Sequence, residues 1–358
     1  MNKKFAVILF NIGGPDQATD QKVKKYLKNF FSDKFIIRTN FLLRKLIAFM
    51  ISTLRYKKTQ AIYNSIGGSS PVLRNTFSQA DSLKEKLGEK FDIYCAMRYW
   101  NPFASEIIHQ MKDQNYEQII LLPLYPQCSS TTTVSAYENW IENVKQILNP
   151  SEAVSFLKKT KLICKHFDNQ KYIDAMSNLI LNKFQEAVQY VPNGKFKLFF
   201  SAHSIPEFLV IKEGDPYQDH IIQTVEMIIE KLKTSNCSID YIITYQSKVG
   251  KLKWLEPMTD AELVKAAKEN IIPIIVPVAF VSENSETLYE LDIEYKELLE
   301  ENGMQHLFRV SALGCDNIYI DLLRDLVNSS VKSDDQFTTK RSCNNKTDCP
   351  CVKYLFIE

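Results

Sequence analysis

A histidine in the middle of the chain is the side chain best placed for acid–base chemistry. His203 directly follows the apolar residues 197–200 and is flanked by Ser201, Ser204 and Pro206. Its imidazole can accept a proton near neutral pH or bind a metal ion. A histidine in such a loop can equally be structural, with its hydrogen bonds satisfied. Since the chain has only five histidines, His203 is the first candidate for a catalytic group.

A second group of titratable side chains follows the apolar residues 271–281. Glu286, Glu290 and Glu294 recur every four residues behind serines that can cap a helix, and an α-helix would place all three on one face. The plain alternative is a solvated acidic face near a helix N-terminus. Carboxylates that repel one another make more sense where a cation or mobile protons share the face. If Glu286 lies near His203, the two would bind a divalent metal ion weakly and could pass it on.

Other side chains suit a flat aromatic ligand that carries carboxylates. Arg98 and Tyr99 follow the apolar residues 91–96, and Ser129 and Ser130 lie in a loop rich in hydroxyl groups. Guanidinium, phenol and hydroxyl groups in one cleft would bind such a ligand. Helix capping is the alternative for the hydroxyl groups.

Three cysteines gather in the polar C-terminal tail, at Cys343, Cys349 and Cys351. Zinc sites and iron–sulfur clusters usually take four ligands, so a fourth must come from elsewhere. Cys164 is the first candidate for it and Cys128 the second. Solvated thiols on a tail without a metal are the alternative.

Residues 34–80 contain no acidic side chain and eight basic ones. Within this stretch, residues 34–58 carry an apolar band broader than one core-facing stripe requires. Such a segment could lie on an anionic membrane surface or cover an amphipathic, anionic ligand. An ordinary basic helix packed on its own domain is the alternative.

The elements that must position these residues follow from an alternation of short apolar runs and amphipathic stretches, which indicates parallel βαβ units. Strands are expected at residues 5–12, 91–96, 118–124, 196–201, 239–245 and 271–281. Helices are expected at residues 20–31, 102–114, 135–148, 219–233, 260–268 and 285–302. The pattern predicts an α/β protein with two Rossmann-like, doubly wound parallel-sheet domains, at residues 1–160 and 161–330, and a cysteine-bearing tail at 331–358. Because such sheets bind ligands beyond the carboxyl ends of their strands, the candidate residues lie where chemistry is expected.

Composition narrows the classes of function. The 358 residues are 45% hydrophobic and 24% charged, and 44 basic against 42 acidic side chains leave a net charge of +2, which gives no global field for nucleic acid. The apolar N-terminal run is too short for a signal peptide, so we expect the protein to lie in a reducing cytoplasm. The eight cysteines of the chain are therefore expected to be thiols or metal ligands. GxGxxG, Walker, GxSxG and HExxH motifs are absent, which disfavours nucleotide-dependent and simple hydrolytic chemistry.

Taken together, the loops resemble those of ferrochelatases, the enzymes of haem synthesis, in family order from about residue 5 to residue 330. The matching segments are Leu9-Phe-Asn-Ile-Gly-Gly-Pro15, Ile66-Gly-Gly-Ser-Ser-Pro71, Met97-Arg-Tyr99, Pro123-Leu-Tyr-Pro-Gln127, Ser129-Ser-Thr-Thr132, Ser201-Ala-His-Ser-Ile-Pro206, Gly214-Asp-Pro-Tyr217, Tyr245-Gln-Ser-Lys-Val-Gly250, Trp254-Leu-Glu-Pro257, Pro277-Val-Ala-Phe-Val281 and Glu286-Thr-Leu-Tyr-Glu-Leu-Asp292. The resemblance implies the chelatase fold and insertion of Fe²⁺ into protoporphyrin IX with release of two protons, as the last step of haem biosynthesis. It implies protoporphyrin IX and ferrous iron as partners and no cofactor for catalysis.

The resemblance also assigns roles to residues. His203 matches the essential histidine of the metal-insertion site, Glu286 the essential glutamate, and Glu290 a carboxylate of the line that leads from it. Asn284 falls where many relatives have histidine, which questions a second imidazole in metal delivery. The remaining matches are to substrate-binding residues of the porphyrin cleft, at Trp254, Arg98, Tyr99, Ser129 and Ser130.

The resemblance leaves further expectations. Some bacterial members bind a 2Fe-2S cluster through clustered tail cysteines and one internal cysteine, so Cys164, Cys343, Cys349 and Cys351 are candidate ligands. Residues 34–58 are expected to form a lip over the cleft that contacts the inner face of the membrane peripherally. The alternatives to a protoporphyrin enzyme are a coproporphyrin III ferrochelatase, a chelatase for another metal, and a non-catalytic tetrapyrrole or metal carrier.

Overall fold

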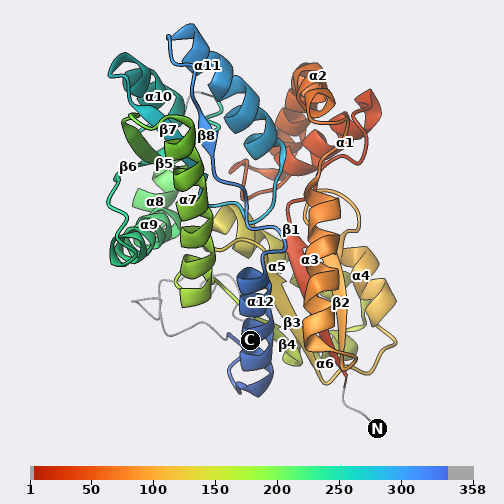
Figure 1. The fold of residues 1–358 in the computed structure, drawn as a ribbon. Coiled ribbons are helices and arrows are strands. Elements are labelled where there is room, and N and C mark those ends of the chain that lie inside the picture. The colour runs from red at the N-terminus through yellow and green to blue at the C-terminus, as the bar shows by residue number, and fades with distance from the viewer. Residues whose placement is uncertain (1–3, 251, 338–358) are drawn as a thin grey trace. The chain divides into compact units, whose positions relative to one another are not determined.

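The computed structural model describes residues 4–250 and 252–337, which form two compact units (Figure 1). Unit 1 contains residues 4–165 and 320–337, and unit 2 contains residues 166–319. This division differs from the predicted domain at 161–330, because the chain returns to unit 1 at residue 320. Lys86 Nζ lies 2.8 Å from Asp321 Oδ1, and Lys161 Nζ donates a hydrogen bond to the Ser330 carbonyl at 2.9 Å. These polar contacts hold the returning segment on unit 1.

Unit 1 is built on a parallel four-stranded sheet with the order β2-β1-β3-β4. Its strands are β1 (Phe5–Asn11), β2 (Phe91–Met97), β3 (Gln118–Pro123) and β4 (Thr160–Leu162). Residues 6–10 of β1 are all buried, as expected of a central strand covered on both faces. Its helices are α1 (Asp20–Phe31), α2 (Phe41–Ser65), α3 (Val72–Leu87), α4 (Ala104–Met111), the π-helix η1 (Ser130–Val134), α5 (Ser135–Ile147), α6 (Pro150–Lys158) and, from residue 320 on, α12 (Asn317–Lys332).

Unit 2 repeats this plan with the order β6-β5-β7-β8, again all parallel. Its strands are β5 (Phe196–His203), β6 (Asp240–Gln246), β7 (Ile272–Pro277) and β8 (Phe308–Arg309). Its helices are α7 (Gln170–Tyr190), α8 (Glu207–Ile211), α9 (Tyr217–Thr234), α10 (Thr259–Lys268), the π-helix η2 (Glu286–Glu294) and α11 (Tyr295–Glu301). Two Rossmann-like parallel sheets confirm the predicted fold class.

In each sheet the first strand lies between the second and the third, so the chain crosses from one side of the first strand to the other. Open parallel sheets bind ligands at this switch point, beyond the carboxyl ends of the two strands concerned. In unit 2 the switch point lies between β5 and β7. The loop that begins at His203 and the loop that leads into η2 therefore start at the same edge of the sheet.

The helix predicted at residues 285–302 is divided in the structure. Its first part is the π-helix η2, and only α11 is α-helical. π-Helical turns are rare and occur frequently at functional sites. The expectation that three glutamates share one α-helical face is therefore not met, and Glu294 is exposed while Glu286 and Glu290 are partly buried.

The loop after β1 requires glycine. Gly13 has a φ of +78°, and a Cβ atom there would lie 2.9 Å from the Cβ atom of Met97. The close approach lets the Arg98 amide donate to the Asn11 carbonyl at 2.8 Å, and the Tyr99 amide to the Ile12 carbonyl at 3.0 Å. The glycine thus fixes where Arg98 and Tyr99 leave the sheet.

Candidate active site

His203 is the last residue of β5, and its orientation is set by its own neighbour. Its Nδ1 atom lies 2.5 Å from the Ser204 carbonyl oxygen. Because a carbonyl oxygen can only accept, Nδ1 carries the proton and donates. In the neutral imidazole the lone pair is therefore on Nε2, and the side chain is 36% exposed. The free nitrogen is the one that can take up a proton.

Glu286 stands opposite that nitrogen, as the first residue of η2. Its Oε1 atom lies 3.8 Å from His203 Nε2, so the structure brings the two predicted residues together. Its Oε2 atom is buried and has no hydrogen-bond partner among the residues that the structure describes. Burial raises the pKa of Glu286, the nearby His203 lowers it, and the negative charge of Glu290 raises it, with a net increase. Glu286 is thus a carboxylate with unused bonding capacity.

Glu290, four residues further along η2, is held quite differently. Its carboxylate accepts hydrogen bonds from Gln246 Nε2 at 3.1 Å, from the Ser247 amide at 2.8 Å and from the Ser247 hydroxyl. The Tyr295 hydroxyl donates a fourth, at 3.0 Å. Four donors fix this side chain in one orientation. Of the two carboxylates, Glu290 is anchored and Glu286 is free to react.

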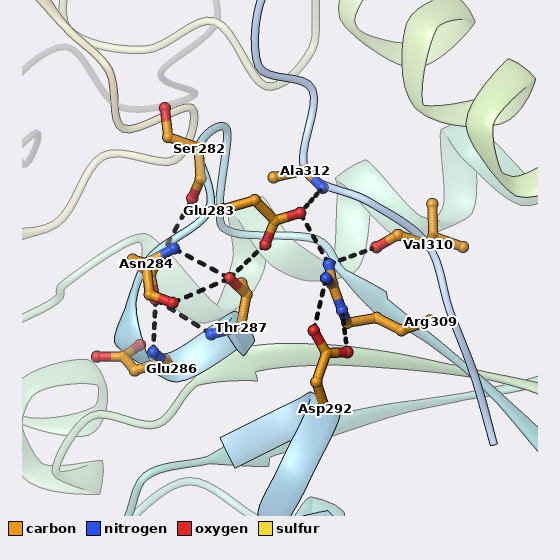
Figure 2. A network of polar contacts seen from close by, with 9 residues as sticks. All are labelled: Ser282, Glu283, Asn284, Glu286, Thr287, Asp292, Arg309, Val310 and Ala312. Atoms are coloured by element: carbon orange, nitrogen blue, oxygen red, sulfur yellow. Dashed lines mark hydrogen bonds and ion pairs between the residues drawn. The ribbon is translucent and has the colours of Figure 1, made fainter. Parts of the chain in front are cut away.

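Asn284 orients the start of η2 (Figure 2). Its Oδ1 atom accepts hydrogen bonds from the main-chain amides of Glu286 at 2.7 Å and Thr287 at 3.2 Å. The main-chain N–H of Asn284 donates to Thr287 Oγ1 at 3.0 Å. The residue is buried, at 7% exposure. Its side chain thus satisfies two amides of the first turn of η2, although the N-cap position itself is Ser285. Figure 2 shows the carboxylate of Glu286 lying outside this set of hydrogen bonds.

A network of ion pairs around Arg309 lies next to the start of η2 and stabilises it. Glu283 Oε1 accepts from Arg309 Nη1 and from the Ala312 amide, both at 2.9 Å, while Arg309 also binds Asp292 through Nε and Nη2 (Figure 2). Burial alone would lower the pKa of Arg309, but the hydrogen bond to Asp292 and the charge of Glu283 raise it. Arg309 thereby links the cap, η2 and β8. Sequence reasoning missed this network: an asparagine two residues before Glu286 was a readable capping signal, but nothing in the sequence indicated Arg309.

Trp254 lies in the segment after β6, which runs antiparallel to the segment after His203. Trp254 pairs with Pro206, and the Leu255 amide donates to the Ile205 carbonyl at 3.0 Å. The indole Nε1 of Trp254 is buried without a hydrogen-bond partner among the described residues. An indole N–H in that position is available to an acceptor on a ligand.

In unit 1, Arg98 and Tyr99 both bind Asp33. Arg98 Nη2 lies 2.7 Å from Asp33 Oδ2, and the Tyr99 hydroxyl donates to the same oxygen at 2.9 Å. The Ser135 hydroxyl also donates to it, and the Phe35 amide donates to Oδ1 at 2.8 Å. Tyr99 is only 2% exposed. The polar groups of this cluster satisfy one another.

Ser129 and Ser130 are both buried. Ser129 caps η1, since its hydroxyl accepts from the Thr131 amide at 3.2 Å. Ser130 Oγ accepts from Arg38 Nη2 at 2.9 Å. The capping alternative from the sequence therefore describes Ser129, and Ser130 contacts the basic segment 34–58 directly.

Cys164 and Cys128 are buried thiols in the same apolar cluster of unit 1, at 5% and 1% exposure. Phe337 belongs to this cluster and pairs in parallel with Leu162, two residues before Cys164. Cys343, Cys349 and Cys351 lie outside the described residues. Within the part of the chain that the structure describes, no group of three or more histidine, cysteine or acidic side chains could hold a metal ion.

Comparison with solved structures supports the class that the two sheets define. The fold matches the structure of SirB from Bacillus subtilis with Fe³⁺ over 91% of this chain and 95% of that chain, with a TM-score of 0.52 and 10% sequence identity. At this identity the likeness shows the fold alone. The chain therefore shares its α/β fold of two parallel sheets with that protein.

Comparison of sequences gives the family. The profile of the Ferrochelatase family matches residues 4–331. Ferrochelatase of Wolbachia sp. subsp. Drosophila simulans (strain wRi) is 43% identical over 327 residues, covering 90% of this chain and 98% of the relative. Ferrochelatase of Pelagibacter ubique (strain HTCC1062) is 39% identical over 360 residues, covering 98% and 99%. The chain belongs to the ferrochelatase family. It is a lyase of haem biosynthesis that inserts ferrous iron into a porphyrin.

Proposed function

We propose that this enzyme inserts Fe²⁺ into protoporphyrin IX, as the last step of haem biosynthesis, through His203 and Glu286. The observation that carries the proposal is the pair itself. A basic imidazole nitrogen faces a carboxylate at 3.8 Å, and the second oxygen of that carboxylate is buried without a partner among the described residues. This arrangement suits a reaction that must remove protons and admit a cation at one place.

The reaction exchanges two pyrrole protons for one Fe²⁺ ion. His203 Nε2 takes up one proton, because its Nδ1 atom is already donating to the Ser204 carbonyl. Glu286 takes up the second, since its raised pKa makes it a better proton acceptor than an ordinary glutamate. The two nitrogens that have lost their protons then bind the iron. Charge and protons balance without a further reactant.

Glu290 contributes negative charge at a fixed position. Its four hydrogen bonds hold the carboxylate still. We assign it the role of attracting Fe²⁺ toward Glu286, rather than of carrying protons by moving. A preorganised charge does this without reorganisation at the moment of reaction.

Trp254 is assigned to substrate binding, because its buried indole N–H has no partner among the described residues and can donate to a porphyrin substituent. Arg98, Tyr99, Ser129 and Ser130 are also assigned to porphyrin binding. Their described hydrogen bonds to Asp33, Thr131 and Arg38 hold them in place. In this role they offer a preshaped surface rather than mobile ligands.

The test is anaerobic Fe²⁺ insertion followed by absorbance, with protoporphyrin IX and coproporphyrin III compared in parallel. The protoporphyrin should be the better substrate. The His203→Ala variant should lose insertion while still binding porphyrin, and the surface variant His109→Ala should keep it. Preference for coproporphyrin would correct the substrate and the last-step role, and near-normal turnover of His203→Ala would refute the site. Porphyrin binding without turnover in the unaltered protein would indicate a carrier.

We also propose a 2Fe-2S cluster held by Cys164 with the tail cysteines Cys343, Cys349 and Cys351. Phe337 pairs in parallel with Leu162, two residues before Cys164, and this supports the assignment. Bound there, the cluster would be a centre outside the insertion chemistry. Protein purified without oxygen should show visible thiolate-to-iron bands, which Cys164→Ser should abolish and Cys237→Ser in unit 2 should not. Loss only in Cys128→Ser would transfer the role to that residue, and colourless protein after reconstitution with iron and sulfide would exclude the cluster.

A peripheral membrane contact through α2 is the last part of the proposal. Seven apolar side chains between Phe41 and Leu54 are 44% to 79% exposed, and the helix also contains Lys45, Lys57 and Lys58. Among the described helices, none is both long and apolar enough to cross a bilayer. The double variant Leu42→Ser with Leu54→Ser should float less with anionic vesicles than the unaltered protein, and Tyr190→Ser should not. Equal flotation of all three would return α2 to a role within the protein.

A further inference from the structure

Behind Glu290 lies a chain of buried polar side chains that the proposed chemistry does not use. Gln246 Nε2 donates to Glu290, and Gln246 Oε1 accepts from the Ser201 hydroxyl at 2.6 Å. Ser201 Oγ lies 2.9 Å from Thr259 Oγ1, which lies 2.9 Å from Thr244 Oγ1. Gln246, Ser201, Thr259 and Thr244 are all 0% exposed. Uncharged polar groups at full burial are costly unless each is satisfied, so such a chain needs a reason.

The donors in this group show how Gln246 is held. Each hydroxyl group has one hydrogen to donate. The Ser201 hydrogen is used on Gln246 Oε1, while Thr259 donates to Thr244 and Thr244 donates to the Phe200 carbonyl at 3.4 Å. The amide oxygen of Gln246 is therefore occupied by Ser201, and its N–H is directed at Glu290.

Gln246 also connects the two halves of the active site through the backbone. It lies opposite His203 in the register of β5 and β6, and its carbonyl accepts from the Ser204 amide at 2.8 Å. The Ser204 carbonyl in turn accepts from His203 Nδ1. One residue thus contacts the carboxylate on η2 with its side chain and the histidine loop with its main chain.

The next residue shows that this geometry is enforced against a local cost. Ser247 has a φ of +65°, a left-handed conformation that costs a residue with a side chain about 1–2 kcal/mol. In this conformation both its amide and its hydroxyl donate to Glu290. Strain of this kind persists where the surrounding structure enforces it, and it clusters at functional sites.

We propose that Gln246 is a positioning residue for iron delivery, which aims the Glu290 carboxylate and holds it in register with His203. The buried hydroxyl group of Ser201 orients it. Because Ser201 donates to the amide oxygen, the amide cannot rotate without losing both hydrogen bonds, and its N–H remains directed at Glu290. The inference rests on the role proposed above for Glu290.

The test compares Gln246→Met with Gln79→Met, which removes another fully buried amide, on α3 of unit 1. A hydrogen bond to a charged group is worth about a tenfold to hundredfold effect when lost. We expect kcat/KM for Fe²⁺ to fall by that factor in Gln246→Met, with the KM for porphyrin unchanged. Gln79→Met should lose comparable thermal stability and keep both kinetic parameters.

Ser201→Ala provides the second arm, and it tests whether Ser201 orients the Gln246 amide should Gln246→Met fail to fold. As a single substitution, Ser201→Ala should lower kcat/KM for Fe²⁺ by a few-fold. In the Gln246→Met background it should add nothing further, because no amide remains to be oriented. Equal losses in both backgrounds, or a Gln246→Met variant whose kinetics match Gln79→Met, would overturn the inference. Failure of the unaltered enzyme to use Fe²⁺ would instead refute the proposed function, so the two failures are distinguishable.

Discussion

The segments that follow the third strand of each unit are built alike and end in different chemistry. In unit 1, β3 ends at Pro123 and leads through a loop to η1 and then α5. In unit 2, β7 ends at Pro277 and leads through a loop to η2 and then α11. Both helices thus begin with a π-helical segment, and both follow the switch point of a parallel sheet with the same strand order.

The difference lies in how the carboxylate near each segment is satisfied. Asp33 of unit 1 is 1% exposed in its side chain and binds Arg98, Tyr99, Ser135 and the Phe35 amide. Glu286 of unit 2 has one oxygen 3.8 Å from His203 and the other without a partner among the described residues. A buried carboxylate whose oxygens are all occupied stabilises a fold, whereas one with an oxygen left over is prepared to bind a proton or a cation. The same architecture therefore holds a fully satisfied carboxylate in unit 1 and, in unit 2, the carboxylate that we propose to be reactive.

Replacing the reactive carboxylate should have the largest effect on catalysis. Glu286→Gln keeps the shape of the side chain but removes a proton acceptor, and insertion should slow by about 100- to 10,000-fold. Stopped-flow absorbance of iron insertion at saturating porphyrin measures this. Turnover within about threefold of the unaltered enzyme would contradict the comparison.

The same variant should separate from the unaltered protein in its dependence of stability on pH. Burial raises the pKa of Glu286 above its ordinary value of 4.5. In the folded protein the Glu286 carboxyl group therefore loses its proton at a higher pH than in the unfolded protein. As the pH rises from 4.5 through the folded-state pKa, the unaltered protein loses stability. Chemical denaturation measures this. Relative to the unaltered protein, the free energy of unfolding of Glu286→Gln should be constant at low pH and should increase toward neutral pH. A parallel pH profile for both proteins would show that the carboxylate is not destabilised by burial.

Removing the fully satisfied carboxylate, Asp33, should lower the stability of the fold. Asp33→Ala leaves the Arg98 guanidinium, 19% exposed, without its buried partner, and breaking such a pair costs about 3–5 kcal/mol of unfolding free energy. Urea denaturation of unit 1 fluorescence or hydrogen exchange measures the loss. A change under about 1 kcal/mol would contradict the conclusion that Asp33 stabilises the fold.

A smaller effect is expected from the network that supports η2. Arg309→Met leaves Glu283 and Asp292 without their shared cation, and loss of a charged hydrogen bond costs about 1.5–3 kcal/mol. Because Glu283 also accepts a hydrogen bond from the Thr287 hydroxyl at the start of η2, iron insertion should also slow, by about tenfold. Arg324→Met is the matched control, since its pairs with Asp321 and Asp325 are more exposed and worth less than about 1 kcal/mol. Equal effects of the two substitutions would remove the network from the site.

The smallest effect concerns the strained residue beside Glu290. Ser247→Gly relieves a left-handed conformation that costs about 1 kcal/mol and removes one of the four donors to the carboxylate. Stability should change by less than about 1 kcal/mol while kcat/KM for Fe²⁺ falls severalfold. Unchanged iron kinetics would show that the strain serves only the turn.

The sequence predicted the parts whose signals are local. The six longer strands were readable as apolar runs, and the spacing of His203 and Glu286 after two of them placed both at one sheet edge. The strands β4 and β8 span only three and two residues, too few for a periodic pattern. The return of the chain to unit 1 at residue 320 depends on contacts with Lys86 and Lys161, which lie far away in the sequence. The π-helical form of η2 was missed because a four-residue repeat of glutamates is also typical of an α-helix.

What the sequence determined by itself was the α/β class and the family, and it named the two residues proposed for the centre of the site, because apolar periodicity and motif order can be read from the sequence alone. The tertiary structure alone decided which of several similar side chains are satisfied and which are not. Asp33, Glu286 and Glu290 are ordinary carboxylates as letters. Only the donors brought to them from distant strands and helices satisfy Asp33 fully, leave one oxygen of Glu286 without a partner among the described residues, and hold Glu290 in one orientation.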